Sequence, residues 1–237
     1  VQDLISEEVD FSESSEIYNS FNSDEKPLSV LLRYDLKSEP KIQFEKNDIT
    51  PENNQKIKIG IVGAGNFAST TIIPILKELR KSCQVLGVSS SGGLSSETLA
   101  KNFKIKNKYS TEEEIFDSEE IDAVFILTQH FNHADLVIKG INSNKAVYVE
   151  KPLAIEVDSI TKIEEAMYNA EDPKIFLGFN RRFSEASYFI KEKLNDTPAN
   201  AINFRFSVPK LEKDHWTNIK EIGGGRIVGE AIHAIDL

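Results

Sequence analysis

The sequence predicts an α/β fold, a doubly wound parallel sheet with helices on both faces, over the larger part of the chain. From Gln55 onward, short apolar runs such as AVFIL (123–127) alternate with amphipathic helical stretches. This alternation is typical of parallel strands that are buried on both faces. The first run, IKIGIV, leads directly into a glycine turn and the helical pattern STTIIPILKELR. A dinucleotide-binding fold requires this strand, turn and helix at its first crossover.

The glycine turn is the clearest binding signal. Gly63, Gly65 and Ala68 occupy the G-x-G-x-x-G/A spacing, with Asn66 and Phe67 between them. A tight turn without side chains lets the backbone approach a pyrophosphate, and the following helix offers N–H groups and a positive dipole end. We therefore predict that these five residues bind a dinucleotide cofactor.

The other elements of this region follow in order. We expect further strands at 84–88, 106–109, 123–127, 146–149 and 175–179, and further helices at 94–103, 133–141, 157–169 and 185–194. Thr111 and Glu114 have the spacing of a capping box, which predicts one more helix start. Beyond Ser184 the alternating stretch INFRFSV (202–208) predicts an antiparallel strand.

Residues 1–54 do not have the pattern of this fold. FSESSEIYNSF predicts a helix with Ser12 as its N-cap, and KPLSVLLRYDL predicts a strand near 29–34. This segment resembles the C-terminal end of medium-chain zinc-dependent alcohol dehydrogenases, and a loosely docked N-terminal extension is the alternative. We expect residues 1–36 to be the tail of an upstream dehydrogenase-like unit. Residues 37–54 are polar and contain two prolines, as a linker does.

Composition excludes several classes of function. A net charge of −10 argues against nucleic acid as the main partner, and the longest apolar run is too short to span a membrane. Without a visible secretory signal, a cytoplasmic protein is expected. The single cysteine, Cys83, allows no internal disulfide and is expected to be a buried, inert thiol. His130 and His133 stand three residues apart, but no third ligand is evident, so we favour capping and packing roles and predict no metal site.

The end of the second predicted strand bears on the choice of cofactor. An acidic residue there favours NAD, and an arginine favours NADP. This chain has Ser89 and Ser90 in that place, followed by Ser91 and two glycines. Small hydroxyls accept a 2′-phosphate and nothing repels it, so we predict NAD or NADP with a slight preference for NADP. The alternative is that this loop is merely flexible.

A second constellation, VYVEKP, places Glu150 and Lys151 after the strand at 146–149, at the carboxyl edge where such sheets bind ligands. An ammonium there can orient a substrate hydroxyl or share in proton transfer. On composition alone, a surface lysine before a helix-starting proline is the more common explanation.

Four motifs that follow one another in a fixed order favour a functional role for Glu150 and Lys151 over a surface position. IVGAGNFA, VEKP, GFNRRFS (178–184) and GGGRIVGEAIHAIDL (223–237) resemble the glucose-fructose oxidoreductase and inositol dehydrogenase family, Gfo/Idh/MocA. The segment AVFILTQHFNHADLVIKGI is also similar to that family, with Thr128 and His133 at its threonine and histidine. The resemblance implies a Rossmann domain, here at 55–172, followed by an α+β substrate domain with an open-faced antiparallel sheet, of which 173–237 is an incomplete start.

The resemblance also implies roles for individual residues. Thr128, Glu150 and Lys151 are expected beside the cofactor, with Lys151 also at the substrate hydroxyl. His233 matches the catalytic histidine, which takes the hydroxyl proton as the hydride leaves, and imidazole suits that task near neutral pH. Arg182 is expected to be structural or close to the substrate.

One position departs from the family pattern. Many members have an aspartate four residues before the histidine, where this chain has Gly229. Glu230 lies one place later, on a different face of a helix. We expect either that Glu230 replaces the aspartate with altered geometry or that another residue supplies the acid. The Lys151–Pro152 bond is a candidate cis peptide.

The function implied by the resemblance is an NAD(P)-dependent oxidoreductase that transfers a hydride between the nicotinamide and a hydroxyl carbon of a sugar, cyclitol or related polyol. A non-catalytic dinucleotide-binding or sensing protein and NAD-assisted glycoside cleavage are the alternatives. Because members normally continue past the histidine motif, we expect a fragment that is inactive alone. In the full-length protein, a homo-oligomer through the substrate-domain sheet is an option.

Overall fold

The computed structural model describes residues 5–14, 16–17, 29–34, 56–91, 94–106, 109–194, 203–205, 210–212 and 214–237. The chain divides into two compact units, Val1–Glu52 and Asn53–Leu237, and each is described by itself.

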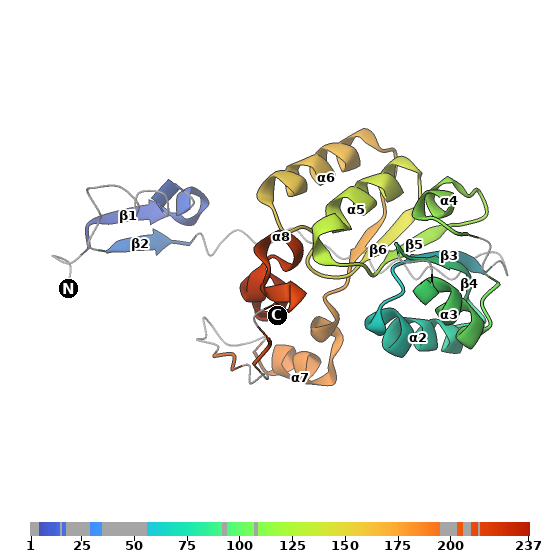
Figure 1. Cartoon of the computed structure of the whole chain (residues 1–237). Coiled ribbons are helices and arrows are strands. Elements are labelled where there is room, and N and C mark those ends of the chain that lie inside the picture. The colour runs from blue at the N-terminus through green and yellow to red at the C-terminus, as the bar shows by residue number, and fades with distance from the viewer. Residues whose placement is uncertain are drawn as a thin grey trace. The chain divides into compact units, whose positions relative to one another are not determined.

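The first unit contains a two-stranded parallel sheet (Figure 1). Strand β1 (Glu7–Asp10) pairs with β2 (Val30–Arg33), with Glu7 opposite Val30. Strand β2 confirms the strand expected near 29–34, whereas β1 was not predicted. The guanidinium of Arg33 donates a hydrogen bond of 3.0 Å to the Glu8 carboxylate on the neighbouring strand. Because both side chains are exposed, this ion pair contributes little to stability.

A short 3-10 helix, η2 (Phe11–Glu13), follows β1 directly. The prediction that Ser12 is an N-cap is wrong here, because Asp10 is the N-cap and Ser12 lies inside the helix. The ring of Phe11 stacks on that of Tyr34 with centroids 4.6 Å apart, which joins the end of β1 to the end of β2.

The second unit is built on a five-stranded parallel sheet with the order β4-β3-β5-β6-β7. Its strands are β3 (Ile57–Val62), β4 (Cys83–Ser89), β5 (Ala123–Ile126), β6 (Ala146–Val149) and β7 (Ile175–Leu177). The sheet confirms the parallel α/β fold. The first strand, β3, has β4 on one side and β5 on the other, so the strand order reverses at β3. The carboxyl ends of β3 and β5 therefore flank the crevice where such sheets bind ligands.

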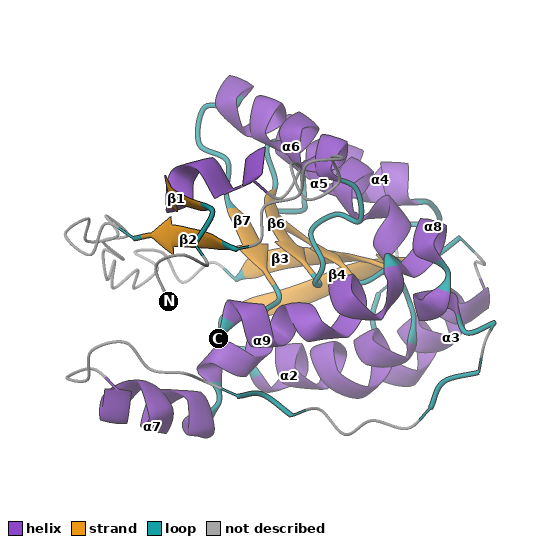
Figure 2. Ribbon diagram, turned by 90° about the vertical axis from the view of Figure 1, so that its left-hand side faces the viewer, coloured by secondary structure: helices purple, strands orange, loops and turns teal. Residues whose placement is uncertain are grey.

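Helices cover both faces of the sheet (Figures 1 and 2). A π-helical turn, η3 (Ala68–Ile72), leads into α2 (Ile73–Glu78), which lies with α3 (Leu94–Phe103) on one face. The other face carries α4 (Glu112–Asp117), α5 (His133–Asn142) and α6 (Val157–Asn169). Each face has its own hydrophobic cluster, which explains the continuously apolar strands.

The capping box expected at Thr111 is confirmed at the start of α4. The Thr111 hydroxyl accepts from the Glu114 N–H, and the Glu114 carboxylate accepts in return from the Thr111 N–H, as a capping box requires. The strand expected at 106–109 is wrong at Lys106 and Tyr109, which are irregular, and 107–108 lie outside the described residues. This segment links α3 to α4, and the Tyr109 hydroxyl lies 2.8 Å from that of Ser118.

After β7 the described residues are helical or irregular. The elements are η5 (Asn180–Phe183), α7 (Glu185–Leu194), η6 (Trp216–Asn218), α8 (Lys220–Gly223), η7 (Ile227–Ala231) and α9 (Ile232–Asp236). The strand expected at 202–208 is wrong at 203–205, where no neighbouring strand supplies a ladder, and its other residues lie outside the described part. The antiparallel substrate sheet stays a prediction.

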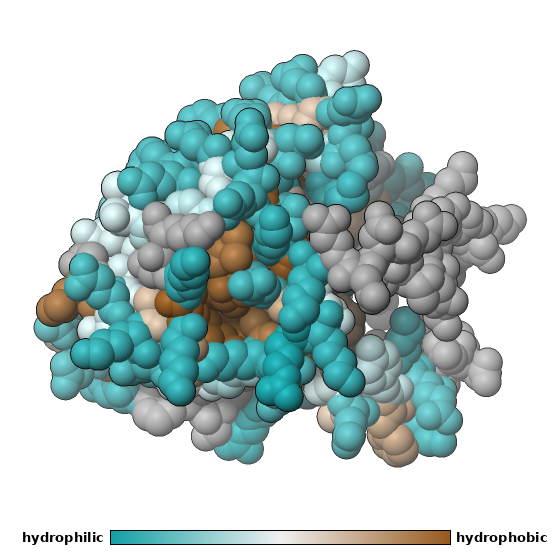
Figure 3. All heavy atoms as spheres, turned by 90° about the vertical axis from the view of Figure 1, so that its right-hand side faces the viewer, coloured by the Kyte–Doolittle hydropathy of each residue, from teal (hydrophilic) through white to brown (hydrophobic). Residues whose placement is uncertain are grey.

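Part of the sheet face that carries α2 and α3 is open. The rings of Phe125, Tyr148, Phe176 and Phe183 stack in a row from β5 across β6 and β7, with centroids 4.7, 5.7 and 6.1 Å apart. A groove of about 530 Å³ lies over these three strands. Figure 3 shows hydrophobic side chains gathered in a hollow that hydrophilic side chains surround.

Three expectations about composition can be compared with the described residues. Cys83 is buried, and burial raises the pKa of its thiol, which confirms the expectation of a buried cysteine and disfavours the reactive thiolate. Among the helices of the described ranges, none combines the length and apolar character that crossing a bilayer requires. Within those same ranges, no three acidic, histidine or cysteine side chains converge as a metal site requires.

Candidate functional site

The glycine turn lies directly against the end of the neighbouring strand. Gly63 has a φ of +106°, a conformation that favours glycine. A Cβ at this position would lie 2.6 Å from the Leu127 carbonyl oxygen and 2.9 Å from the Thr128 nitrogen. The turn can therefore close against β5 only without a side chain at Gly63.

The second glycine faces open space. A Cβ on Gly65 would meet no atom within 4 Å, and Gly65, Asn66 and Phe67 are exposed. By contrast, Ala68 is fully buried and holds the start of the helix in the core. The backbone around Gly65 is thus accessible at the N-terminal end of a helix, and this arrangement fits a pyrophosphate.

The end of β4 adjoins the same turn. The Gly63 N–H donates a hydrogen bond of 2.9 Å to the Ser89 carbonyl oxygen. The Ser89 hydroxyl is buried and has no hydrogen-bond partner among the described residues, while the Ser90 hydroxyl lies 2.8 Å from that of Ser95. Buried hydroxyls in proteins nearly always have a partner, so the Ser89 hydroxyl is an exception at the end of β4.

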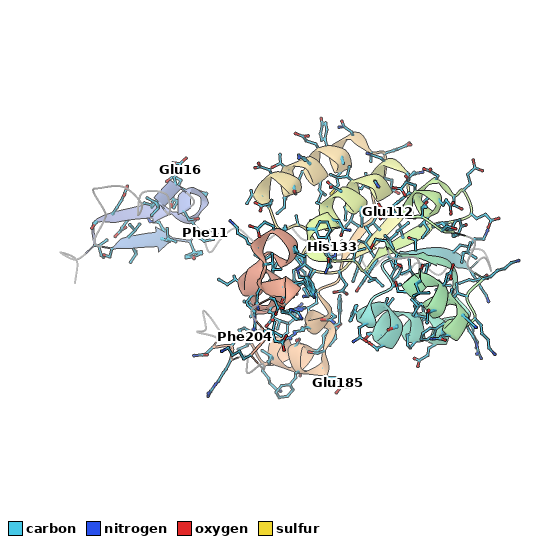
Figure 4. All side chains as sticks on the ribbon, in the orientation of Figure 1. Phe11, Glu16, Glu112, His133, Glu185 and Phe204 are labelled. Atoms are coloured by element: carbon cyan, nitrogen blue, oxygen red, sulfur yellow. The ribbon has the colours of Figure 1, made fainter. Side chains whose placement is uncertain are left out.

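His133 joins the ends of β5 and β6. Its Nδ1 lies 2.7 Å from the Pro152 carbonyl oxygen, and its Nε2 lies 3.1 Å from the Thr128 carbonyl oxygen. The ring is fully buried at the end of α5 near the C-terminal segment (Figure 4), and burial lowers its pKa. A neutral imidazole has a single N–H and so donates to one of these two carbonyls. The Thr128 hydroxyl donates to Asn132 over 2.6 Å.

Glu150 directly follows β6 and is held by Tyr148, a residue of that strand. The Tyr148 hydroxyl donates a hydrogen bond of 2.6 Å to Glu150 Oε1. Burial raises the pKa of Glu150, and the Tyr148 hydrogen bond and the charge of Lys151 act in the opposite direction. The peptide bond between Lys151 and Pro152 is cis, which confirms that expectation.

Lys151 connects the sheet to the C-terminal segment. Its ammonium donates a hydrogen bond of 2.6 Å to the Gly229 carbonyl oxygen. Burial lowers the pKa of Lys151, the nearby carboxylates of Glu150 and Glu230 raise it, and the charge of Arg181 lowers it. The segment that contains His233 is thereby held at the carboxyl edge of the sheet.

His233 is buried and neutral at physiological pH. Burial, with the positive charges of Lys151 and Arg181, lowers its pKa to about 4. Its Nδ1 is buried and has no hydrogen-bond partner in the part of the chain that the structure describes. The ring lies edge-on to Phe179, with centroids 6.1 Å apart. A neutral imidazole with an unengaged nitrogen can accept a proton from a hydroxyl.

His130, for which capping and packing roles were expected, lies at the same junction. Its Nδ1 donates to the Gly223 carbonyl oxygen over 2.8 Å, and its ring meets the edge of Trp216 with centroids 4.7 Å apart. A Cβ on Gly229 would lie 3.5 Å from the His130 ring, an ordinary contact. Chiefly through burial, the pKa of His130 is lowered to about 4.

Two of the predicted substrate residues are engaged in ion pairs. Arg182 donates to Asp236 through both Nε, at 3.0 Å, and NH2. Glu230 accepts from Arg226 over 2.8 Å, although it is close enough to Lys151 to raise the pKa of that ammonium. Their roles toward a substrate stay predictions.

The predicted site residues therefore lie at the carboxyl edge of the sheet, in two groups. Gly63, Gly65 and Ser89 lie at the ends of β3 and β4, and Glu150, Lys151 and His233 gather beyond β6. Thr128 lies between the two parts, beside Gly63 and hydrogen-bonded to His133. Tyr148 was missed, although its alternation with Glu150 along β6 was a signal that could have found it.

This geometry agrees with a match to a family model, which covers the parallel sheet from β3 into β7. Residues 57–176 match the model of the Gfo/Idh/MocA oxidoreductase family, which has an NAD-binding Rossmann fold. The chain belongs to this family. The match extends from the start of β3 to the middle of β7 and so includes the glycine turn and Lys151.

Relatives in the Gfo/Idh/MocA family include several dehydrogenases. The inositol 2-dehydrogenase/D-chiro-inositol 3-dehydrogenase of Lacticaseibacillus casei is 26% identical over 59% of this chain and 40% of that protein. The mouse trans-1,2-dihydrobenzene-1,2-diol dehydrogenase is 26% identical over 71% of this chain and 51% of that protein. The chain thus covers about half or less of the length of these relatives.

Two solved structures agree with the fold. The myo-inositol dehydrogenase of Lactobacillus casei, in complex with NAD(H) and myo-inositol, superposes with a TM-score of 0.56 at 25% identity, over 60% of this chain and 42% of that chain. A 3-ketoreductase from Actinomadura kijaniata with bound NADP gives a TM-score of 0.66 at 17% identity, over 76% of this chain and 56% of that chain, which supports the fold alone.

Proposed function

We propose that this chain carries the cofactor site and part of the catalytic site of an NAD(P)-dependent oxidoreductase that acts on a hydroxyl carbon of a cyclitol, sugar or related polyol. The observation that supports the proposal is the hydrogen bond from Lys151 to Gly229, because it joins the segment that contains His233 to the residue that follows the carboxyl end of β6. Family membership and the inositol dehydrogenases among the relatives support the same reaction class.

Each residue has a physically suited task in this proposal. The open backbone at Gly65 and the buried hydroxyl of Ser89 bind the pyrophosphate and adenosine end of the cofactor. When bound, the nicotinamide supplies the hydride acceptor or donor. The Lys151 ammonium orients the substrate hydroxyl, and its charge favours the oxygen as that oxygen loses its proton. His233, whose imidazole is neutral, takes the proton.

For the choice of cofactor we propose NADP over NAD. The carboxyl end of β4 has the hydroxyls of Ser89 and Ser90 and, before the two residues that the structure leaves out, no carboxylate to repel a 2′-phosphate. Equilibrium titrations with NADPH and NADH test this proposal. Tighter binding of NADPH supports it, and tighter binding of NADH overturns the preference while leaving dinucleotide binding intact.

Activity is tested with the full natural protein and a panel of polyols that begins with myo-inositol. Reduction of the cofactor by one of them, with loss of turnover in Lys151→Ala and His233→Ala, supports the oxidoreductase. Tight cofactor binding without reduction by any polyol indicates a sensor. Hydrolysis of a glycoside without net reduction indicates NAD-assisted cleavage. The same protein, examined by light scattering, tests the proposed homo-oligomer.

A further inference from the structure

Tyr148 and Glu150 form a pair on one side of strand β6. They are two residues apart in the sequence, so their side chains project from the same face. The Tyr148 hydroxyl donates a 2.6 Å hydrogen bond to Glu150 Oε1. One oxygen of the carboxylate is therefore fixed in position by a group from its own strand.

The chain segment at Gly178 packs closely against this pair. A Cβ on Gly178 would lie 2.7 Å from Glu150 Oε1 and 2.8 Å from the Tyr148 hydroxyl oxygen. The Gly178 N–H donates to the Val149 carbonyl oxygen over 2.8 Å, so this backbone cannot easily withdraw. Only a glycine at this position leaves room for the phenol and the carboxylate to meet.

The phenol ring is itself held by stacking. It lies between Phe125 and Phe176, with centroids 4.7 and 5.7 Å away. Aromatic stacking of this kind restricts the ring and therefore the direction of its hydroxyl. The hydroxyl of Tyr148 reaches Glu150 from a rigid support.

The surroundings of Glu150 determine which form of its carboxyl group is favoured, and a hydrogen-bond donor favours the ionised form. Burial raises the pKa of this carboxyl, which favours the neutral acid. The Tyr148 hydroxyl, the Lys151 ammonium and the Lys151 backbone N–H all lower the pKa and favour the carboxylate. His133 approaches the backbone of Glu150 from α5. Burial also raises the pKa of Tyr148, so the phenol keeps its proton and remains a donor.

We propose that Tyr148 is a positioning residue, whose hydroxyl holds Oε1 of Glu150 so that the carboxylate presents its remaining acceptor positions to the ribose hydroxyls beside the nicotinamide. This inference rests on the proposed function and on the expectation, implied by the family resemblance, that Glu150 lies beside the cofactor. It assigns the orientation of Glu150 to a residue that does not itself touch the cofactor.

The experiment measures dissociation constants for NADH and NADPH by nicotinamide fluorescence in the wild type, Tyr148→Phe, Glu150→Gln and the double variant. Tyr148→Phe keeps the stacked ring and removes only the hydroxyl. Because a hydrogen bond to a charged group is lost, we expect the dissociation constant to rise about tenfold. Glu150→Gln should weaken binding at least as much, and the double variant should be no weaker than Glu150→Gln within about twofold.

Two further measurements separate positioning from packing. Phe176→Leu removes one of the two stacking neighbours but keeps the hydroxyl, so it should raise the dissociation constant clearly less than Tyr148→Phe does. The pH midpoint at which cofactor affinity falls on acidification should move upward in Tyr148→Phe, since the donor that favours the carboxylate is gone, and should disappear in Glu150→Gln. Gly178→Ala, which crowds the pair from the other side, should weaken binding as Tyr148→Phe does.

The outcomes are distinguishable. Losses in Tyr148→Phe and Glu150→Gln that add in the double variant, or equal losses in Tyr148→Phe and Phe176→Leu, overturn the positioning role while dinucleotide binding stands. Unchanged affinity in Glu150→Gln also overturns it. A wild type that binds neither dinucleotide overturns the proposed function, and this inference with it.

Discussion

The ammonium of Lys151 lies 2.6 Å from the carbonyl oxygen of Gly229, and this hydrogen bond joins two segments that are 78 residues apart in the sequence. Its acceptor is a backbone oxygen at a residue without a side chain, so the bond itself does not neutralise the ammonium. The charge is balanced instead by Glu150 and Glu230, both of which raise the pKa of Lys151. Burial is the largest influence on this ammonium and lowers its pKa overall, against these two carboxylates.

Replacing Lys151 with methionine should separate chemistry from cofactor binding. We expect turnover by the full natural protein to fall more than about a hundredfold, because a charged donor at the substrate is lost. The dissociation constant for NADPH should change less than about threefold. Steady-state kinetics and fluorescence titration check these expectations.

Lys145 offers a matched control for that substitution. Its ammonium also donates a 2.6 Å hydrogen bond to a backbone carbonyl, that of Ser118, and burial also lowers its pKa. Lys145→Met and Lys151→Met should each reduce the free energy of unfolding by about 1–3 kcal/mol, and only Lys151→Met should reduce turnover. Equal effects on turnover would show that Lys151 acts through stability alone.

The two glycines of the turn should respond differently to alanine. Gly63→Ala places a Cβ 2.6 Å from Leu127 in a left-handed conformation, so the free energy of unfolding should fall by about 2–4 kcal/mol. Gly65→Ala meets no atom within 4 Å and should change stability by less than about 0.5 kcal/mol.

The affinity for the cofactor is the second property to measure in these glycine variants. If the pyrophosphate lies over Gly65, Gly65→Ala should weaken NADPH binding about tenfold or more, because a methyl group then occupies the approach to the backbone. Urea unfolding and fluorescence titration measure both quantities. A stable Gly65→Ala variant with unchanged affinity contradicts this placement.

Acid should destabilise the second unit between pH 6.5 and about 4. His130 has an ordinary pKa of 6.5 when unfolded and a pKa of about 4 in the folded state. In that interval the unfolded state binds more protons, so stability is greatest above pH 6.5 and falls as the pH is lowered. His233 has the same shift and adds to the same slope.

The single tryptophan reports on this transition directly. Trp216 meets the His130 ring at 4.7 Å, so its fluorescence should change as His130 gains a proton. His130→Gln should make the stability of the second unit less dependent on pH in this interval. An unchanged slope in that variant would assign the acid sensitivity to other groups.

His133 should tolerate asparagine better than leucine. His133→Leu leaves the carbonyls of Pro152 and Thr128 without their imidazole partner, and the free energy of unfolding should fall by about 2–4 kcal/mol. His133→Asn keeps a short donor and should recover part of that loss. Equal destabilisation of the two variants, measured by urea unfolding, would indicate that only ring volume matters.

Features set by local sequence could be predicted. The turn at Gly63 follows from backbone geometry and a close approach to the next strand, so its spacing is visible in the sequence. The strands of the second unit are buried on both faces and therefore read as continuous apolar runs. The expected strand at 106–109 failed because two alternating residues carry too little periodic signal to separate a strand from a connection.

Contacts between distant segments could not be predicted from the residues alone. His130 reaches Gly223 across 93 residues, and nothing in the local pattern around either residue indicates the other. Arg182 was expected to be structural or close to the substrate, but nothing in its own motif indicates that its guanidinium pairs with Asp236 in another motif. The position of a motif predicts which segment comes to the site, whereas the partner of each side chain depends on tertiary packing.

The strand order has a consequence for how the protein is made. Strand β3 pairs with β5, and the Lys58 N–H bonds Asp122 across 64 residues, so the glycine turn leaves the ribosome well before the strand end against which it closes. Lys151 in turn reaches Gly229 only after a further 78 residues have been synthesised. Such long loops slow the formation of the contacts that close them. A nascent chain therefore contains its phosphate-binding turn early and can form its lysine–glycine junction only after Gly229 has been synthesised.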